Sequence, residues 1–201
     1  MTLCKKFVAV IKIKWRLRLR GVQQSFLSVL VLISTLVAGD LRAQTSTLKE
    51  YEMKASFLYN FMKYVDWPRA GKLETTNVAT IGLLGENPFG NAFSVLENKT
   101  VNGRRLIVKR IERPEDAAQC QIVFISSSEK NRLPQILETV KTLSVLTVGE
   151  TEGFADRGGI INLIAEKNNI RLEINPQAAG NAGLTISSQL LKLPKVRIVR
   201  G

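Results

Sequence analysis

The chain has 201 residues, with 29 Lys or Arg against 17 Asp or Glu, a formal net charge of +12, and no histidine. The missing histidine excludes Ser-His-Asp and Cys-His catalytic arrangements, HExxH metal sites and imidazole ligands for zinc, copper or haem. An apolar share of 45% with 23% charged residues is typical of a globular protein, and the length suits a single domain.

The N-terminal segment carries much of the positive charge. Residues 1–43 contain eight Lys or Arg and one Asp, so the remaining chain has a balance of +5. A basic stretch, the apolar run 25–39 and small residues before Gln44 follow the three-part layout of a secretory signal. We expect cleavage after Ala43, with Gly39 as the alternative site, and export to the periplasm. An uncleaved membrane anchor is the alternative interpretation, although the apolar run is shorter than the ~20 residues that a spanning helix needs.

Because an exported protein rarely meets DNA or RNA, we do not expect a nucleic acid as partner. The remaining positive charge is expected to lie on a solvated surface.

Residues 44–49 are expected to be a flexible lead-in, of which Gln44–Thr47 precede the first predicted helix. Residues 50–201 are expected to form one domain. From Leu48 to Trp67, polar residues recur three and four positions apart, which predicts an amphipathic helix with its apolar face in the core. The polar positions are Lys49, Glu52, Ser56, Asn60 and Lys63. Pro68 is expected to end the helix, because the residue before a proline disfavours helical geometry.

Downstream, short apolar runs alternate with helical patterns. Strands are predicted at 78–84, 105–111, 121–125 and 144–148, the second of them towards a sheet edge. A short helix is predicted at 88–96, capped by Asn87, and a longer one at 129–142, capped by Ser127 or Ser128. Residues 160–165 and 170–174 are typical of an antiparallel hairpin turning at Asn168-Asn169, and 176–193 of one or two helices broken at Gly183. The alternation predicts an α/β sandwich with a partly parallel sheet and a C-terminal antiparallel hairpin.

Cys120 is the one cysteine after the leader, so no intrachain disulfide is expected. It directly precedes the apolar run 122–125, which favours a buried apolar role over a reactive free thiol.

Three segments have alternative chemical interpretations. The glycines of 82–90 follow a strand, as in a phosphate-binding loop, but they match neither GxGxxG nor GxxxxGK[ST]. Glu150, Glu152 and Asp156 lie among the glycines of 149–159, where a metal or sugar site competes with a solvated turn, which we favour. Ser126-Ser127-Ser128 lacks the glycines and the histidine of a nucleophile elbow, so helix capping is the better interpretation. We therefore predict no catalytic residue, no metal and no cofactor.

Several phrases in series resemble the YfiR family of small exported proteins. They are YEMKASFLYNFMKYVDWP (51–68), GENPFG (85–90), KTVNG (99–103), LTVGETEGF (146–154), GGIIN (158–162) and RLEIN (171–175). The resemblance covers about residues 50–195. It implies a three-layer α/β domain with a mixed, mostly parallel sheet and helices on both faces. It also implies action by protein contact and no enzymatic activity.

The best-known member of that family restrains a membrane-bound diguanylate cyclase from the periplasmic side, and an outer-membrane lipoprotein relieves the restraint. By resemblance we expect this chain to bind the periplasmic part of such a cyclase or of another membrane sensor. Association into a homodimer is a further alternative. Most of Phe57, Phe61 and Tyr64 is expected in the core. The candidate partner-binding residues are Tyr59, Asn60, Lys63 and Trp67, because exposed aromatic side chains anchor interfaces. The alternative is a small-ligand-binding accessory module that reports to a histidine kinase or an outer-membrane receptor.

Overall fold

The structure is a computed structural model that describes residues 46–67, 77–96, 98–167 and 169–200. The chain divides into residues 1–46 and a compact unit of residues 47–201, and the fold below is that of the second unit. The predicted leader, its cleavage site and Gln44 lie outside the described residues.

Within the described residues, eight strands form one sheet in the order β10-β8-β7-β6-β5-β2-β4-β3, and β1 pairs with β9 in a separate antiparallel ribbon. The strands are β1 (Val65–Asp66), β2 (Val78–Leu84), β3 (Thr100–Val101), β4 (Arg104–Ile111), β5 (Ile122–Ile125), β6 (Leu146–Gly149), β7 (Ile161–Glu166), β8 (Asn169–Ile174), β9 (Thr185–Ile186) and β10 (Val196–Ile198). Residues 46–64 are helical, and the other helices are η2 (Gly90–Leu96), η3 (Pro114–Gln119), η4 (Ser127–Glu129), α2 (Leu133–Val140), α3 (Pro176–Asn181) and α4 (Ser188–Leu191).

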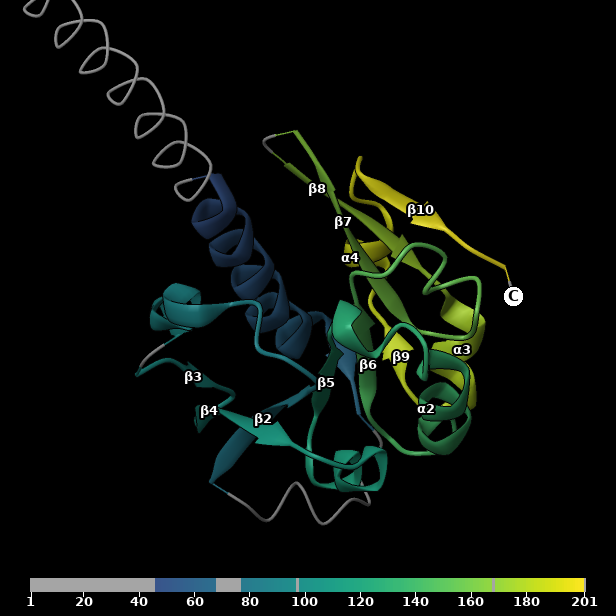
Figure 1. Ribbon diagram of the computed structural model, residues 1–201, viewed down its shortest axis with the longest axis horizontal. Helices are drawn as coiled ribbons and strands as arrows, with labels where there is room; N and C mark the ends of the chain where they lie inside the picture. Colours follow the sequence, from purple (N-terminus) through teal and green to yellow (C-terminus); the bar gives the residue numbers. More distant parts are fainter. Residues whose placement is uncertain (1–45, 68–76, 97, 168, 201) are drawn as a thin grey trace, which may run out of the picture. The chain divides into compact units, whose positions relative to one another are not determined.

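The central strands β4-β2-β5-β6-β7 run parallel (Figure 1). The chain passes from β2 to β4 on one side and then returns to build β5, β6 and β7 on the other. β2 and β5 therefore flank a topological switch point, and the loops after their carboxyl ends meet there. The antiparallel pairs β7-β8 and β3-β4 border this parallel centre.

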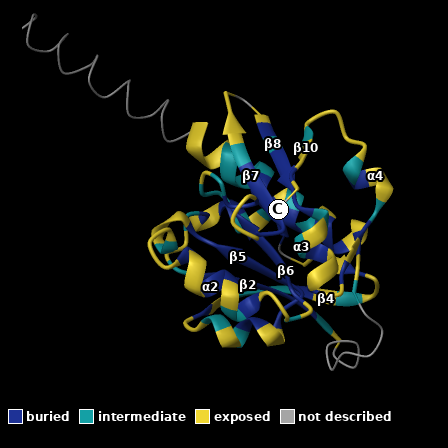
Figure 2. Ribbon diagram, turned by 90° about the vertical axis from the view of Figure 1, so that its right-hand side faces the viewer, coloured by how far each residue is buried: buried dark blue, intermediate teal, exposed yellow. Residues whose placement is uncertain are grey.

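Two hydrophobic clusters lie on opposite faces of the sheet, because successive side chains of a strand point to opposite sides. In β5, Ile122 and Phe124 belong to one cluster and Val123 and Ile125 to the other. The first cluster also contains buried residues of the helix of residues 46–64, α3 and α4, and the second contains those of η3 and α2. Figure 2 shows the buried strands between more exposed helices. The predicted mixed, mostly parallel α/β sandwich is confirmed.

The first helix differs from its prediction at both ends. Residues 46–49 are helical, so the helix begins before the predicted Leu48, and the flexibility of the lead-in 44–49 stays a prediction. Leu48, Lys49 and Glu50 are good helix formers, and neither Gly nor Pro interrupts them. The helix ends at residue 64 instead of Trp67, because Val65 and Asp66 pair with Ile186 and Thr185. A tertiary pairing thus replaces the last predicted turn.

The turns and caps of the central segment also shift. Asn87 Oδ1 accepts a hydrogen bond from the Phe89 N–H at 2.9 Å, but the helix that follows is η2, which begins at Gly90. The predicted helix 129–142 is divided into η4 and α2, and Ser126, not Ser127 or Ser128, caps η4. Pro134 lies at the start of α2, where its missing N–H costs nothing.

The predicted hairpin is confirmed as β7-β8. Its left-handed residue is Lys167, with φ of 51°, and not Asn169; Asn168 lies outside the described residues. The break at Gly183, with φ of 71°, separates α3 from β9. β9 and β10 were not predicted, since each is too short to show an alternating pattern. Among the described residues, no helix is long and apolar enough to cross a membrane.

Candidate interaction surface

Tyr59 is the centre of an exposed cluster at the carboxyl half of the first helix. Its hydroxyl donates a hydrogen bond to the Thr100 carbonyl in β3 at 3.2 Å, which holds the half-buried ring in one orientation. Lys63 Nζ lies 4.2 Å from the ring centroid and Lys99 Nζ 5.5 Å, both within the range of a cation–π interaction. We call Tyr59, Lys63 and Lys99 the aromatic-basic cluster.

Three of the four candidate partner-binding residues are available on this surface. Asn60 and Lys63 are exposed and Tyr59 is half-buried beside them. Trp67 is half-buried as well, and its ring, like that of Tyr59, packs against the core. Its Nε1 donates to the Gln121 carbonyl at 3.2 Å, and it follows β1, outside the aromatic-basic cluster. The role of these residues in binding stays a prediction.

Two of the three aromatic residues that were expected in the core are buried or half-buried, and the third is exposed. Phe61 is fully buried and Phe57 is half-buried with its ring stacked on Phe61, as expected. Tyr64 is 38% exposed, so its assignment to the core was wrong. Tyr64, Asn60 and Lys63 share one helix face, because residues three and four apart are neighbours on a helix. Lys99 was missed as a site residue, since nothing in its local sequence links it to Tyr59.

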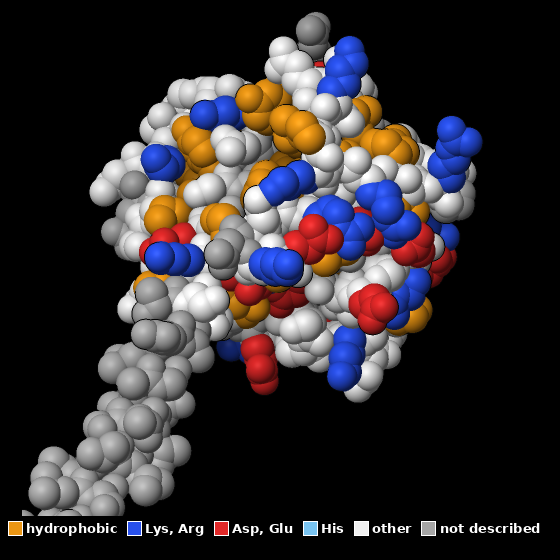
Figure 3. Space-filling model, turned by 90° about the horizontal axis from the view of Figure 1, so that it is seen from above, with side chains coloured by type: hydrophobic (Ala, Val, Ile, Leu, Met, Phe, Trp, Pro, Cys, Tyr) orange, Lys and Arg blue, Asp and Glu red, His pale blue; other side chains and the backbone are white. Residues whose placement is uncertain are grey.

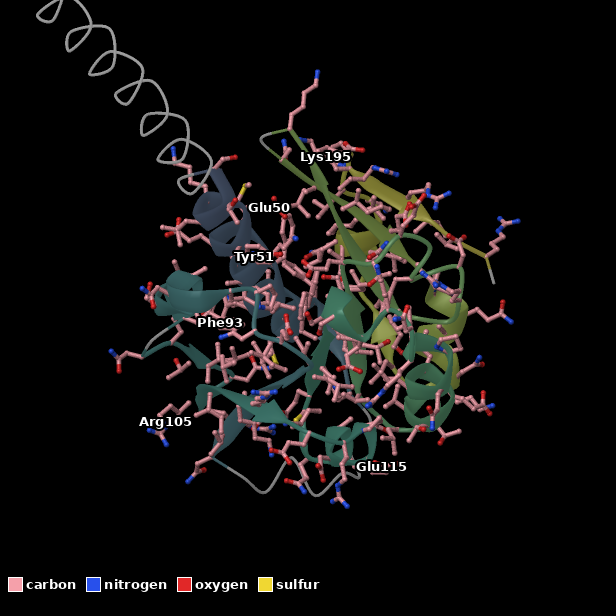
Figure 4. The ribbon with its side chains drawn as sticks, viewed as in Figure 1. Glu50, Tyr51, Phe93, Arg105, Glu115 and Lys195 are labelled. Atoms are coloured by element: carbon pink, nitrogen blue, oxygen red, sulfur yellow. The ribbon has the colours of Figure 1, made fainter. Side chains whose placement is uncertain are left out.

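A groove lies between η2 and β4, the neighbour of β3. It has a volume of about 530 Å³, and apolar side chains, Phe93, Leu96, Leu106 and Val108, form much of its lining. Figure 4 shows Phe93 on η2 beside the first helix. An apolar groove of this kind can accept an apolar side chain of a partner.

The switch point of the sheet is occupied by the chain's own loops. The Glu86 N–H donates to Ser128 Oγ at 3.0 Å, and the Ser126 N–H donates to the Leu84 carbonyl at 3.0 Å. Gly85 has φ of +92°, and a Cβ atom there would lie 2.6 Å from Ser128 Oγ. The loop that was compared with a phosphate-binding loop thus packs on the serines, which serve in capping and loop contacts.

A buried ion pair connects the first helix to the carboxyl end of β6. Lys54 Nζ lies 2.6 Å from Glu50 Oε1 and 2.7 Å from Glu150 Oε2, and the side chains of Lys54 and Glu150 are only 4% and 6% exposed. The Tyr51 hydroxyl also donates to Glu150, at 3.2 Å. Burial and then the negative charge of Glu150 raise the pKa of Tyr51 well above its ordinary value. Figure 4 shows Glu50 and Tyr51 on this helix.

This arrangement decides between the interpretations of the acidic loop. Glu150 points into the ion pair, while Asp156 lies 3.7 Å from Arg197 and Glu152 is exposed. In the described part of the chain, no three acidic or cysteine side chains are grouped as metal ligands. The loop is also not merely a solvated turn, because Phe154 is completely buried within it.

Comparison with known proteins identifies the family of the chain. Residues 51–195 match the model of the family DUF4154, described as YfiR/HmsC-like. The chain belongs to the YfiR/HmsC-like family. Membership supports a periplasmic regulatory protein in general, rather than an enzyme. Among curated proteins, none matches the sequence.

Three solved structures have a similar arrangement of elements at low identity. They are a conserved domain protein from Vibrio cholerae (14% identity, TM-score 0.46), the ABC domain in complex with L-Trp from Streptococcus pneumonia (12%, 0.44) and CD0873, a substrate binding protein with adhesive properties from Clostridium difficile (11%, 0.42). The matches cover 73%, 61% and 61% of this chain and 60%, 56% and 54% of those chains. The chain therefore spans a little over half the length of each.

In this YfiR/HmsC-like chain, the phrases GGIIN and RLEIN meet in a buried polar network. Asn162 Nδ2 donates to Glu173 Oε2 at 3.2 Å, and Arg171 lies 3.4 Å from Glu173 Oε1. The Asn175 side chain caps α3 and donates to the Ala155 carbonyl at 3.0 Å. These shared residues thus hold β7, β8, α3 and the acidic loop together.

Cys120 lies in the core, as predicted. It is completely buried, and burial raises the pKa of its thiol to about 11, although the charge of Lys109 acts in the opposite direction. The predicted burial of Cys120 is confirmed, and the raised pKa disfavours the thiolate, which is the reactive form.

A second hollow of about 400 Å³ lies between α2 and α3. Its lining mixes polar and apolar groups, with Leu137 and Val140 from α2, and Thr147, Asn175 and Gln177 around them. Its size is within the range of pockets for small molecules.

Proposed function

We propose that this chain is a non-enzymatic periplasmic regulator that restrains a membrane-bound signalling enzyme, a diguanylate cyclase, by contact with its periplasmic part. The observation that carries the proposal is the YfiR/HmsC-like match over residues 51–195. An outer-membrane lipoprotein that relieves the restraint belongs to the same proposal. The binding affinity of the chain must differ between the active and inactive states of the partner, since a ligand with equal affinity for both shifts neither.

The aromatic-basic cluster and the neighbouring groove support a contact role. Tyr59 offers a rigid aromatic ring with a polar tip, and Lys63 and Lys99 surround it with positive charge. Tyrosine is enriched among the residues that dominate protein interfaces, whereas lysine is depleted there, so Tyr59 is the expected anchor and the lysines the charged surroundings. We propose Tyr59, Asn60 and Lys63 as contact residues.

Deletion of the gene tests the partner class, and a variant tests the surface. Deletion is expected to raise cellular cyclic di-GMP and biofilm formation, because the restraint is lost. The double variant Tyr59→Ala with Lys63→Glu is expected to reproduce the deletion. Because Tyr59 also packs against the core and donates to the Thr100 carbonyl, the thermal midpoint of the purified variant must show that it is folded at the growth temperature. Lys49→Glu changes an exposed charge on the same helix but more than two turns away, and it should behave as the wild type.

Two outcomes would count against the proposal. Unchanged cyclic di-GMP and biofilm after deletion would reject a diguanylate cyclase as the partner. A Tyr59→Ala with Lys63→Glu variant that still restrains the enzyme would place the contact elsewhere on the surface. A pull-down from solubilised membranes with the protein as bait then identifies the partner.

The hollow between α2 and α3 favours one alternative, a module that binds a small ligand and reports to a histidine kinase or an outer-membrane receptor. A thermal-shift screen of small periplasmic metabolites tests it, because a ligand that binds only the folded state raises the melting temperature. Gln177 lines the hollow and is exposed, so Gln177→Trp should block the shift without unfolding the domain.

A further inference from the structure

The outermost strand on one side of the main sheet is β10, which pairs only with β8 among the described residues. Figure 1 shows it at the rim of the domain, with the C-terminus beyond it. β10 lies after residue 195, where the family match ends.

The hydrogen bonds of β10 show which backbone groups face outward. The Leu172 N–H donates to the Lys195 carbonyl at 2.9 Å, and the Val199 N–H donates to the Ile174 carbonyl at 2.8 Å. Since alternate residues of a strand direct their backbone groups to the same side, Arg197 also faces β8, whereas Val196 and Ile198 face away. The Val196 N–H donates to the Leu193 carbonyl at 3.0 Å. Within the described residues, the Ile198 N–H and the Val196 and Ile198 carbonyls have no partner.

β10 is held in place independently of any partner. Arg197 Nε donates to Glu173 Oε1 at 2.9 Å, and its second nitrogen lies 2.6 Å from the same oxygen. Glu173 is a buried residue of β8, so this contact is partly shielded from solvent. Val199 is also buried. The edge is thus already in extended geometry, which lowers the entropic cost of adding a further strand.

The side chains along the edge indicate the chemistry of its occupant. Ile198 is 45% exposed and Leu193 44%, which leaves apolar surface next to the open backbone groups. Lys192, Lys195 and Arg200 are exposed and form no ion pair among the described residues. No Asp or Glu follows Glu173 in the chain. Figure 3 shows one face on which Lys and Arg, Asp and Glu, and exposed hydrophobic side chains are mixed, and Figure 4 places Lys195 near the start of β10.

We propose that the free edge of β10 is a docking strand for an extended, acidic segment of a partner protein. The partner segment adds a strand to the sheet by pairing with the Ile198 N–H and the outward carbonyls, while Lys195 and Arg200 select its acidic side chains. A second copy of this chain is disfavoured as the occupant, because two β10 edges would bring the same unpaired positive charges together. Lysines at a sheet edge also protect sheets from self-association, because they repel each other. The same positive charges attract an acidic strand, which is therefore the complementary partner.

This inference rests on the proposed function, since it names a surface and a segment chemistry for the regulator's protein contact. The aromatic-basic cluster is formed by the first helix and by Lys99 before β3, whereas β10 lies at residues 196–198, so variants can separate the two surfaces.

The binding test uses the complete chain and a blocked, fluorescein-labelled peptide, Glu-Val-Asp-Val-Thr-Val-Glu, measured by fluorescence anisotropy. Two peptides serve as controls: Lys-Val-Lys-Val-Thr-Val-Lys reverses the charge, and Glu-Pro-Asp-Pro-Thr-Pro-Glu keeps the charge but cannot form a strand ladder. The first peptide is expected to bind at least tenfold more tightly than either control. At saturation, hydrogen exchange at the Ile198 N–H should slow at least tenfold, with the already bonded Val199 N–H as the reference.

Ile198→Pro removes the outward N–H and leaves the hydrogen bonds of β10 to β8 intact, so it should weaken binding of the acidic peptide at least tenfold. Ile198→Val keeps the N–H and should bind as the wild type. The thermal midpoint of each variant shows whether it folds. If Ile198→Pro lowers that midpoint, the double variant Lys195→Glu with Arg200→Glu replaces it as the test. This variant is expected to bind the basic peptide more tightly than the acidic one.

Three results would overturn the inference. Equal binding of the proline peptide or of a short DNA duplex would mean that the surface attracts any polyanion. Equal binding of the lysine peptide would remove the charge selection, and full binding by Ile198→Pro would remove the strand pairing. In cells, Ile198→Pro should mimic the gene deletion. Suppose that deletion of the gene alters cyclic di-GMP but cells with Ile198→Pro keep the wild-type level. This result rejects the docking strand in this role and leaves the proposed function standing. A silent deletion rejects the proposed function, while the peptide results still decide the edge.

Discussion

At the scale of single residues, Lys54 shows how burial changes the meaning of a charged side chain. It lies on the helix face that also buries Leu58 and Phe61, and its ammonium group is held by Glu50 and Glu150. Removing one partner of a buried ion pair leaves an uncompensated charge, which typically costs about 3–5 kcal/mol. One oxygen of Glu150 already lacks a hydrogen-bond partner among the described residues.

Lys54→Met is therefore expected to lower the free energy of unfolding by about 3 kcal/mol, since Glu150 stays buried and loses its main cation. Adding Glu150→Gln should restore much of this loss, because the uncompensated charge disappears and the Tyr51 hydroxyl can still donate. Urea denaturation of the two single variants and the double variant measures the coupling. Additive losses would show that the two side chains do not depend on each other.

Cys120 gives a prediction for alkaline pH. The thiol pKa is 9.0 in the unfolded chain and about 11 in the folded one, because burial disfavours the thiolate. A raised pKa of an acid means that the stabilisation is complete below pH 9 and is lost as the pH rises from 9 to 11. The loss from this group is about 3 kcal/mol.

Urea denaturation between pH 8 and 11 checks this expectation. Cys120→Ala should lower the stability at pH 8, since it leaves a cavity, but its stability should fall less steeply above pH 9 than that of the wild type. The native thiol should also react with a disulfide reagent far more slowly than the thiol in urea. Equal rates in the two states would show that Cys120 is accessible.

At the scale of elements, the loop of residues 150–159 folds around one aromatic ring. A Cβ atom at Gly149 would lie 2.4 Å from Phe154, and one at Gly159 would lie 2.1 Å from it. These two glycines are thus required by the close approach of the ring, not by a left-handed backbone. The same glycines were interpreted from the sequence as a turn, because sequence alone does not show what packs against them.

Gly159→Ala is expected to destabilise the domain by about 1–3 kcal/mol, because the added methyl group must displace the Phe154 ring. Gly180→Ala in α3 is the matched control, since nothing lies within 4 Å of its Cβ position. That change should be neutral or stabilise the helix by up to about 1 kcal/mol. Thermal unfolding measures the midpoints of both variants. Equal midpoints would mean that the loop accommodates the added methyl group without loss of stability.

The edges of the sheet also depend on tertiary structure. β2, β5 and β6 are apolar runs that any buried parallel strand requires, so the sequence predicts them within two residues. β9 has two residues and β10 has three, and each is a strand only because β1 or β8 presents its hydrogen-bonding groups. Short strands of this kind carry no periodic signal of their own.

At the scale of the whole molecule, the fold places its charged groups in two different environments. Lys54 and Glu173 stabilise the interior through ion pairs, while Lys63, Lys99 and Lys195 lie at surfaces where a partner can reach them. Exposed basic side chains lie at the aromatic-basic cluster and near the edge of β10, and others, such as Arg105 and Arg132, lie elsewhere on the surface. The positive balance of +5 in residues 44–201 therefore does not correspond to one patch with one ligand.

The sequence by itself determined the α/β class, the order of the main strands and helices, the amphipathic first helix, the buried Cys120 and the family. Each of these follows from local composition, periodicity or a series of phrases. The tertiary structure alone decided that Trp67 bonds to Gln121, that Tyr64 is exposed, that Lys99 joins Tyr59, that Glu150 pairs with Lys54, and that β10 ends the sheet. These features depend on contacts between residues far apart in the chain, and the free energy of such contacts leaves no periodic pattern in the sequence.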